Sequence, residues 1–410
     1  MRDDENSSLN RRDFLQTGVA AVASGAAVGT TSSPAIAQEA ANKVKVLPRR
    51  ALGKTGVDVT ILNQGTWRSP DSLDRLLRLG YASGIRYVDT AKSYGSEPGV
   101  AKWLQGMPAG TRKEVFLVTK DSPKTPQELI AQLDKRCEAL NVDYIDLLFI
   151  HGIGTGYPVD SIDWPKSKEL KQTIAAIKKS GKCKFVGFSC HDARKAEYLM
   201  SAAEGGLVDA IMVAYTPWLD KDAPLNRALD ACHKMGIGLI SMKQISGTND
   251  VILKEVPKHV PTLKEKGLSA YQGLLHAIWT DERISSCCVS MRNTDQLREN
   301  TRAAEVFAPL NAVEMKQLQN ALLASGPTFC ANCDGSCSRA GGTDADLGDL
   351  ARLLTYHDHY GFRGEARKLY SELPAKARDW TGADLIAARK ACPNRLDFTN
   401  LLAKVERELA

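Results

Sequence analysis

Short apolar runs alternate with amphipathic stretches through the middle of this chain. The amphipathic stretches, such as TPQELIAQLDKRCEALN and SKELKQTIAAIKKSG, are typical of helices. The strand candidates are VDVTIL around Val59, IRYV before Asp89, EVFLVT before Lys120, YIDLLFI before His151, KFVGF before Ser189, DAIMVAY around Val213, GIGLISM around Leu239 and ISSCCVS around Cys288. Strand-then-helix units repeated in this way over roughly 250 residues predict a (β/α)8 barrel of the α/β class. A doubly wound sheet is the alternative, but no G-x-G-x-x-G follows an early strand.

The pattern becomes wholly helical from about Ala312 onward. AVEMKQLQNALLAS, DADLGDLARLLTYHDHYG and EARKLYSELPAKARDW are helix candidates, and a last helix ends in LLAKVERELA. Gly326-Pro327 marks the junction to this region. The sequence therefore predicts a barrel over residues 49–310 and a helical, cysteine-containing extension over residues 311–410.

The N-terminal segment has the features of an export signal. The pair Arg11-Arg12 stands in NRRDFLQ and is followed by the weakly apolar TGVAAVASGAAVG. Ala35 and Ala37 then form an A-x-A cleavage pattern. These features predict a twin-arginine (Tat) signal peptide over residues 1–37 and a polar linker over residues 38–48. We expect a periplasmic protein that meets the Tat translocase during its export.

Composition and charge narrow the classes of partner. The 410 residues are 43% hydrophobic and 25% charged, which is ordinary for a globular protein. The net charge of +6 is mild and the positive residues are scattered, so we expect no nucleic-acid binding. The apolar stretch of the signal is too short and too rich in glycine to span a bilayer stably. No cysteine stands near the cleavage pattern, so we expect no membrane anchor.

Four residue types that together can move a proton stand at the ends of three consecutive strand candidates. Asp89 and Tyr94 follow IRYV, Lys120 ends EVFLVTK, and His151 ends YIDLLFIH. Because the carboxyl ends of barrel strands meet at one mouth, we expect these side chains to converge. Tyr94 would supply a proton, and Lys120, held by Asp89, would lower the pKa of the phenol. His151 would polarise and orient a carbonyl group.

Four cysteines gather in the helical extension. Cys330, Cys333 and Cys337 form a compact trio with two and three residues between them, and Cys392 comes later, before a proline. Thiolates at such spacing suit an iron–sulfur cluster or zinc, because a short loop can wrap the metal. A pair of disulfides is the other alternative, which an oxidising periplasm would permit.

These residues and motifs resemble those of the aldo/keto reductases over roughly residues 48 to 306. RALGKTGVDVTILNQGTWR is similar to the family's opening strand pair, DTAKSYG to the signature with its catalytic Asp and Tyr, and NVDYIDLLFIHG to the strand that ends in its active-site His. The resemblance implies hydride transfer between a nicotinamide and a small carbonyl or alcohol substrate. Tyr94 would be the general acid, Lys120 and Asp89 its tuners, and His151 the carbonyl-orienting residue.

The resemblance also implies that NADP or NAD lies extended across the barrel mouth. Gly65 and Thr66 match a nucleotide-contacting Gly-Thr, and Asp89 counts among the cofactor contacts as well as the tetrad. Ser189 matches a Ser-Asn pair that holds the nicotinamide carboxamide, although Cys190 replaces the Asn. Met242 stands where many members stack an aromatic ring on the nicotinamide.

The late segment SMRNTDQLREN resembles the family's loop for the adenosine phosphate. Glu299 and Asn300 match its adenine-side pair. Ser290 and Gln296 occupy places where many NADP-preferring members carry Lys and Arg. Arg292 or Arg298 would then read a 2′-phosphate through charge-assisted hydrogen bonds.

The helical tail resembles the ferredoxin-like extension of one branch of the aldo/keto reductases. That extension usually carries two cysteine motifs, each ending in Cys-Pro. Here the trio Cys330, Cys333 and Cys337 survives from the first motif and Cys392 from the second. Since the Cys-Pro cysteine of one motif ligates the cluster of the other, these four would complete one 4Fe–4S site.

The sequence therefore predicts an exported oxidoreductase with a nicotinamide site, a cluster in its extension and a possible redox partner. Two other readings remain open. One is a non-catalytic, nucleotide-binding scaffold subunit of a periplasmic redox complex. The other is an oxidoreductase that uses only the cluster, with a barrel that binds no nucleotide.

Overall fold

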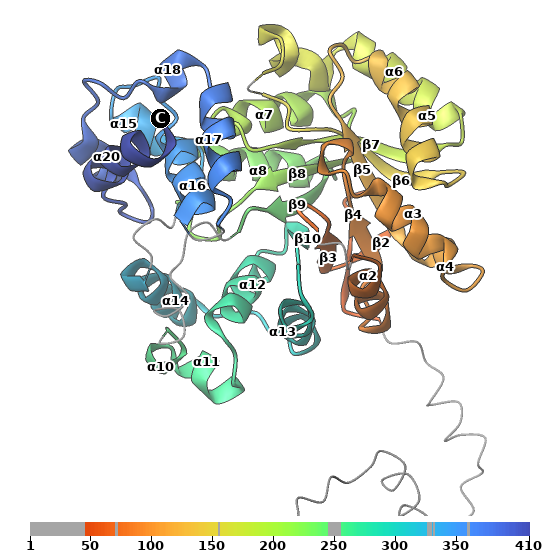
Figure 1. Ribbon diagram of the computed structural model, residues 1–410, viewed down its shortest axis with the longest axis horizontal. Coiled ribbons are helices and arrows are strands. Elements are labelled where there is room, and N and C mark those ends of the chain that lie inside the picture. The colour runs from red at the N-terminus through yellow and green to blue at the C-terminus, as the bar shows by residue number, and fades with distance from the viewer. Residues whose placement is uncertain are drawn as a thin grey trace, which may run out of the picture. The chain divides into compact units, whose positions relative to one another are not determined.

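Eight parallel strands close into a barrel, in the order β10-β3-β4-β5-β6-β7-β8-β9 (Figure 1). They are β3 (Leu62–Gly65), β4 (Tyr87–Asp89), β5 (Phe116–Asp121), β6 (Ile145–Ile150), β7 (Cys183–Cys190), β8 (Ala210–Ala214), β9 (Gly238–Met242) and β10 (Ile284–Val289). The predicted (β/α)8 barrel with a helical C-terminal part is thus confirmed.

The computed structural model describes residues 46–69, 73–154, 156–244, 256–325, 330, 333–358 and 361–410. Lys45–Ala410 form one compact unit. The predicted signal peptide and most of the predicted linker lie outside the described residues, as do Gly326 and Pro327. Among the helices of the described ranges, none is both long and apolar enough to cross a membrane.

The first strand candidate was placed wrongly. Its centre, Val59, lies in β2 (Asp58–Thr60), which pairs antiparallel with β1 (Arg49–Ala51) outside the barrel sheet. The first barrel strand begins only at Leu62. This segment is apolar because the hairpin packs against the amino-terminal end of the barrel. Leu52 and Val59 are buried in the cluster that fills the barrel interior.

Helices follow the strands and cover the barrel from outside (Figure 1). The helical elements around the barrel are α2 (Leu73–Ala82), η2 (Lys92–Tyr94), α3 (Glu97–Gln105), α4 (Thr111–Glu114), α5 (Glu128–Leu140), η3 (Val159–Lys166), α6 (Lys168–Lys179), α7 (Lys195–Gly205), α8 (Pro224–Lys234), α10 (Val256–His259), α11 (Pro261–Lys266), α12 (Ala270–Thr280) and α13 (Thr294–Glu305). Polar caps define where several begin: Ser167 accepts a hydrogen bond from Leu170 N, and Ser269 forms a capping box with Gln272.

Alternation along the strands separates the two faces of the barrel wall. In β5, Phe116 and Val118 belong to the interior cluster, whereas Leu117 between them packs outward under the helices. In β6, Leu147 and Phe149 point inward by the same rule. The inward positions are therefore apolar in the lower part of the barrel.

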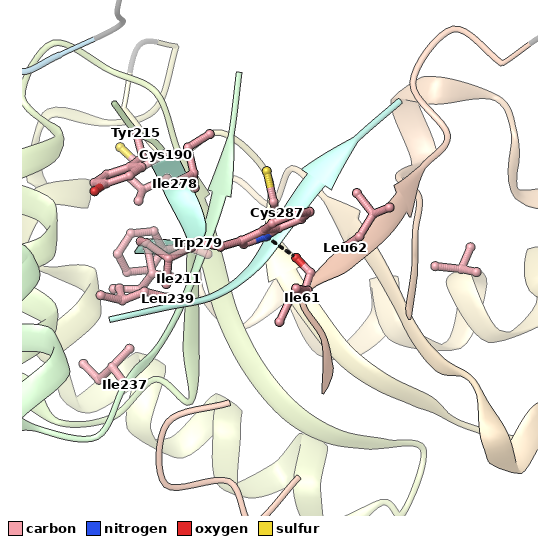
Figure 2. Packing of buried hydrophobic residues seen from close by; sticks show 14 of the residues in the cluster. Ile61, Leu62, Cys190, Ile211, Tyr215, Ile237, Leu239, Ile278, Trp279 and Cys287 are labelled. Atoms are coloured by element: carbon pink, nitrogen blue, oxygen red, sulfur yellow. Dashed lines mark hydrogen bonds between the residues drawn. The ribbon is translucent and has the colours of Figure 1, made fainter. Parts of the chain in front are cut away.

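Trp279, at the end of α12, anchors the outer layer (Figure 2). It is fully buried among Ile61, Ile211 and Leu239, and its indole Nε1 donates to the carbonyl of Ile61 at 2.8 Å. This bond satisfies a donor that would otherwise be buried without a partner, which favours a single position for the helix.

The helical tail divides into two parts by packing. Helix α14 (Ala312–Ser325) lies beside α10 and α12, and its Leu318 and Leu322 belong to the barrel's outer core (Figure 1). The remaining helices are α15 (Ser336–Ala340), α16 (Leu347–Asp358), α17 (Arg363–Glu372), α18 (Ala375–Arg378), α19 (Leu385–Ala391) and α20 (Phe398–Leu409). They enclose a hydrophobic core of their own, which includes Leu350, Leu354 and Phe398.

Gly187 offers a test of barrel packing. A Cβ at this position would lie 1.8 Å from the carbonyl oxygen of Ala210 and 3.0 Å from the ring of Phe149. Gly187→Ala should therefore lower the free energy of unfolding by about 1–3 kcal/mol, measured by urea denaturation. The matched control is Gly364→Ala in α17, where a Cβ meets open space. Equal midpoints for the two variants would contradict this packing.

Candidate active site

The four predicted proton-moving residues meet at the carboxyl ends of β4, β5 and β6. Asp89 is the last residue of β4, Lys120 lies near the end of β5, and His151 directly follows β6. Tyr94 ends the short 3-10 helix η2, after β4. The predicted convergence is therefore present in the structure.

Lys120 is the centre of this group. Its side chain is 1% exposed, and its Nζ donates to Asp89 Oδ1 and, at 2.9 Å, to the carbonyl of Thr90. The same Nζ lies 5.1 Å from the centroid of the Tyr94 ring. Burial alone would lower the pKa of Lys120, but the neighbouring Asp89 and Tyr94 raise it above its ordinary value. Lys120 is therefore held as an ammonium beneath the phenol.

The phenol of Tyr94 is protonated at neutral pH. Burial raises the pKa of Tyr94 to about 12, and the charge of Lys120 opposes this rise. The expectation that Lys120 lowers the phenol pKa is right in direction, but burial outweighs it in this structure. Tyr94 can therefore donate a proton, and Lys120 stabilises the phenolate that remains.

His151 is held as a neutral imidazole. Burial, reinforced by the charges of Lys120 and Lys243, lowers the pKa of His151 to about 3. Its ring lies 5.5 Å from the Tyr94 ring at an interplanar angle of 84°, and Ser93 Oγ is 3.3 Å from its Nδ1. A neutral ring with one nitrogen engaged by Ser93 can offer the other to a substrate oxygen.

A second buried charge network fixes the segment that carries Tyr94. Glu97, at the start of α3, accepts from Thr119 Oγ1 at 2.7 Å and pairs with Arg136 at 2.6 Å. Arg136 also lies 3.4 Å from Asp121. Since Thr119 and Asp121 flank Lys120 on β5, the network ties the tyrosine segment to the strand that holds the lysine.

The predicted Gly65-Thr66 pair lies at the rim of the mouth. Gly65 is buried, and a Cβ at this position would lie 3.0 Å from Ser290 Oγ and 3.1 Å from Cys288 Sγ, so a larger residue would crowd these two side chains. The Thr66 hydroxyl is fully buried, donates to the carbonyl of Asp89 at 3.0 Å and contacts Ser96 Oγ at 2.8 Å. The side chain of Thr66 thus braces the loop after β4.

Ser189 and Met242 lie at the ends of β7 and β9. Ser189 Oγ accepts from the backbone N–H of Gly152 at 2.8 Å, directly beside His151. Met242 is half-buried against the interior cluster. Cys190, which replaces the expected Asn, is buried on the outer face of β7, and its thiol donates to the carbonyl of Ile153. It therefore supports the loop after His151 from behind.

The residues expected near the adenosine phosphate follow β10. Gln296 Oε1 accepts from the backbone N–H of Arg292 at 2.9 Å, and Asn300 is buried in α13. The backbone carbonyl of Glu299 accepts from Gln272. The guanidinium of Arg292 lies 5.1 Å from the ring centroid of Phe362 in the extension. The structure thus brings the extension against this loop, which sequence reasoning did not anticipate.

The four extension cysteines line one cavity. Cys330, Cys337 and Cys392 are buried and Cys333 is half-buried. All ten cysteines of the chain are described, and none of them forms a disulfide. Burial, followed by the other three cysteines, raises the pKa of Cys337. In the described residues no three His, Cys, Asp or Glu side chains are arranged tightly enough to hold a metal ion.

Sequence reasoning missed several residues around these two sites. Cys288, expected to be a plain buried hydrophobe, lies beside Asp89 and Gly65, and burial and Asp89 raise its thiol pKa. Lys243 follows β9 with a backbone φ of 56°, an uncommon conformation for a non-glycine residue. Burial and the charge of Arg352 lower the pKa of Lys243. Only their positions could have signalled them: Cys288 lies near the carboxyl end of β10, and Lys243 directly follows β9.

Comparison with known proteins finds a family match within the barrel. The aldo/keto reductase family matches residues 61–249. The chain is 22% identical to L-glyceraldehyde 3-phosphate reductase of Escherichia coli over 313 residues, which cover 62% of this chain and 86% of the relative. It is 26% identical to L-galactose dehydrogenase of Arabidopsis thaliana, with coverage of 62% and 87%.

Solved structures show the same barrel. An aldo-keto reductase from Bacillus halodurans matches with a TM-score of 0.54 and 20% identity, over 67% of this chain and 96% of the other. The fold and these relatives define the class: an NAD(P)-dependent oxidoreductase built on a (β/α)8 barrel. The chain carries an aldo/keto reductase family domain.

The buried Lys120–Asp89 pair makes a prediction about stability. Asp89→Asn or Lys120→Met alone should lower the free energy of unfolding by about 3–5 kcal/mol, because each leaves a buried partner uncompensated. The double variant should lose clearly less than the sum of the two. Urea denaturation of the four proteins measures this coupling. Lys182→Met, which removes an exposed pair with Asp134, is the control and should leave the midpoint unchanged. Strict additivity at Asp89 and Lys120 would contradict the pair.

Proposed function

We propose that this protein is an exported oxidoreductase that transfers hydride between a nicotinamide and a small carbonyl or alcohol substrate. The observation that carries the proposal is the buried ammonium of Lys120, which is paired with Asp89 directly beneath the Tyr94 ring. A scaffold that only bound a nucleotide would not need a buried ion pair tuned to a phenol.

In carbonyl reduction, a bound nicotinamide supplies the hydride to the carbonyl carbon. Tyr94 gives its proton to the carbonyl oxygen, and Lys120 stabilises the phenolate left behind. The neutral ring of His151 donates a hydrogen bond that polarises and orients the same carbonyl. In the reverse direction, the Tyr94 phenolate accepts the proton of the alcohol.

The nucleotide would lie across the barrel mouth. Its nicotinamide end would meet Ser189 and Met242, and its adenosine end would meet the loop and helix after β10. That second set comprises Ser290, Arg292, Gln296, Glu299 and Asn300. Support for NADP comes from the name of one relative, glycerol 2-dehydrogenase (NADP(+)) of Saccharomyces cerevisiae, which is 25% identical over 64% of this chain. The names of the relatives favour small sugar-like aldehydes or alcohols as substrates.

Cys330, Cys333, Cys337 and Cys392 would hold a 4Fe–4S cluster. Two observations support this assignment: the four cysteines line one cavity, and none of them forms a disulfide. A cluster there would add one-electron chemistry to the two-electron chemistry of a hydride. Zinc is the alternative occupant of the same thiols.

The twin-arginine motif supports export to the periplasm with the cofactors already bound. Because we expect no free nicotinamide pool there, the nucleotide would leave the cytoplasm tightly held. It would then be recycled by a second substrate or through the cluster and a redox partner.

A second candidate function is a non-catalytic nucleotide-binding subunit of a periplasmic redox complex. The observation in its favour is the altered nicotinamide side of the mouth: Cys190 faces outward and Met242 stands in place of an aromatic ring. The complete tetrad argues for the enzyme.

Tyr94→Phe separates the two candidates. If Tyr94 is the general acid, kcat for NADPH-dependent reduction of aldehydes such as glyceraldehyde should fall between about 100-fold and 10,000-fold. The control is Tyr144→Phe, because Tyr144 stands before β6 at the far end of the barrel from the tetrad. Wild-type turnover in Tyr94→Phe would overturn the proton-donor role. Biological function retained without any turnover would favour the scaffold.

The same ionisations set the pH profile of reduction. Because the Tyr94 phenol stays protonated until pH approaches about 12, kcat/KM should be level between roughly pH 6 and 9. Because the pKa of His151 is near 3, no step from this ring should appear in that window. A step near pH 6.5 that disappears in His151→Asn would show that the ring ionises during turnover.

Native mass spectrometry of protein purified anaerobically from the periplasm tests the cofactors and export together. We expect cleavage after Ala37, a bound nicotinamide nucleotide and the mass of a 4Fe–4S cluster. Cys392→Ser should lose the cluster, whereas Cys232→Ser, buried in α8 of the barrel, should retain it. A dialysed wild-type protein without nucleotide would contradict tight binding, and a mass lower by paired hydrogens would indicate disulfides.

A further inference from the structure

The barrel itself builds one wall of the cysteine cavity. His191 and Lys195, at the start of the segment after β7, line the cavity together with the four cysteines of the extension. The Lys195 side chain is buried, with 1% of the residue exposed. Its Nζ donates to the backbone carbonyl of Asp192 at 3.1 Å, which uses one of the three donors of an ammonium group.

Positive charge faces the thiols from both sides of the cavity. The charge of Lys195 opposes the rise that burial causes in the pKa of Cys333. From the extension, Arg352 is 4% exposed and pairs with Asp349, yet two of its guanidinium nitrogens are buried without a hydrogen-bond partner among the described residues. Cys330 lies near enough to act on the Arg352 charge.

Buried cations beside a cavity lower the stability of the folded protein unless anionic groups lie close to them. Burying a cation costs several kcal/mol when no opposite charge compensates it. Asp349 pairs with Arg352, and Asp346 accepts from the backbone N–H of Asp349. Asp346 also lines the cavity, where the charges of Lys195 and Arg352 oppose the rise that burial causes in its pKa. Lys195 therefore already faces one acidic side chain on the same side of the cavity as the cysteines. The group that four cysteinates and a cluster would form is anionic and would occupy the space that Lys195 lines.

We propose that Lys195 is the barrel's counter-charge for an anionic iron–sulfur cluster held by the extension, and that it raises the reduction potential of that cluster. This inference rests on the cluster in the proposed function. Reduction adds one electron, and hence one negative charge, to the cluster, so a nearby ammonium stabilises the reduced form more than the oxidised form. The extension alone would therefore not reproduce the potential.

An anaerobic titration with dithionite and redox mediators, followed by electron paramagnetic resonance of the reduced cluster, tests Lys195→Met in the full-length holoprotein. The equilibrium constant for reduction should fall by about tenfold, which is 59 mV for a one-electron couple. Lys195→Arg should keep most of the wild-type potential, because it preserves the charge. The remote control is Lys184→Met, which removes an exposed lysine of β7 that pairs with Asp146 of β6.

The outcomes are distinct. A wild-type potential in a cluster-loaded Lys195→Met protein overturns the counter-charge and leaves the cluster assignment intact. An equal drop in Lys195→Met and Lys195→Arg also overturns it, because packing rather than charge would then be responsible. If Lys195→Met does not fold, Lys195→Gln takes its place with the same expected shift. A wild-type protein without iron overturns the cluster assignment and this inference together, while the turnover of the tetrad is judged separately.

Discussion

Closure of the eight strands is the constraint on which the site depends. In a closed barrel, every second residue of each strand must point inward, and parallel strands place their last inward residues at one mouth. The last two inward residues are Tyr87 and Asp89 in β4, and Val118 and Lys120 in β5. At the end of β6 they are Phe149 and His151. Each of these three strands thus carries an apolar residue lower in the barrel and a polar residue at the mouth.

The same constraint explains why a charged pair can be buried there. The pairing of Asp89 with Val118 in register places Lys120 one inward step above, within reach of the Asp89 carboxylate. Burial raises the pKa of Asp89, and the lysine charge opposes this rise. The pair is thus a compromise between desolvation and attraction, and the adjacent phenol is the group whose acidity it tunes.

Much of the fold and the tetrad could be predicted from the sequence, because alternation and strand ends are local patterns. The opening hairpin could not be recognised in the same way, since VDVTIL has the composition of a barrel strand. Only tertiary packing shows that Val59 lies outside the barrel sheet and packs against the interior cluster. The outward position of Cys190 follows from a single step of register beyond Ser189. The contacts of Arg292 with Phe362, and of Lys195 with the cysteine cavity, join segments far apart in sequence, and no local pattern encodes them.

Those long-range contacts bring the two candidate sites close to each other. His191 lines the cysteine cavity, and a Cβ at Gly152, the residue after His151, would lie 3.7 Å from His191 Nε2. The charge of Lys243 and burial lower the pKa of His191, so the ring between the two sites is neutral. A charge that appeared in the cysteine cavity would act on the tetrad across this single ring, in surroundings of low dielectric. The barrel and its extension therefore share a chain of buried charges: in addition to burial, Arg352 lowers the pKa of Lys243, and Lys243 lowers the pKa of His151.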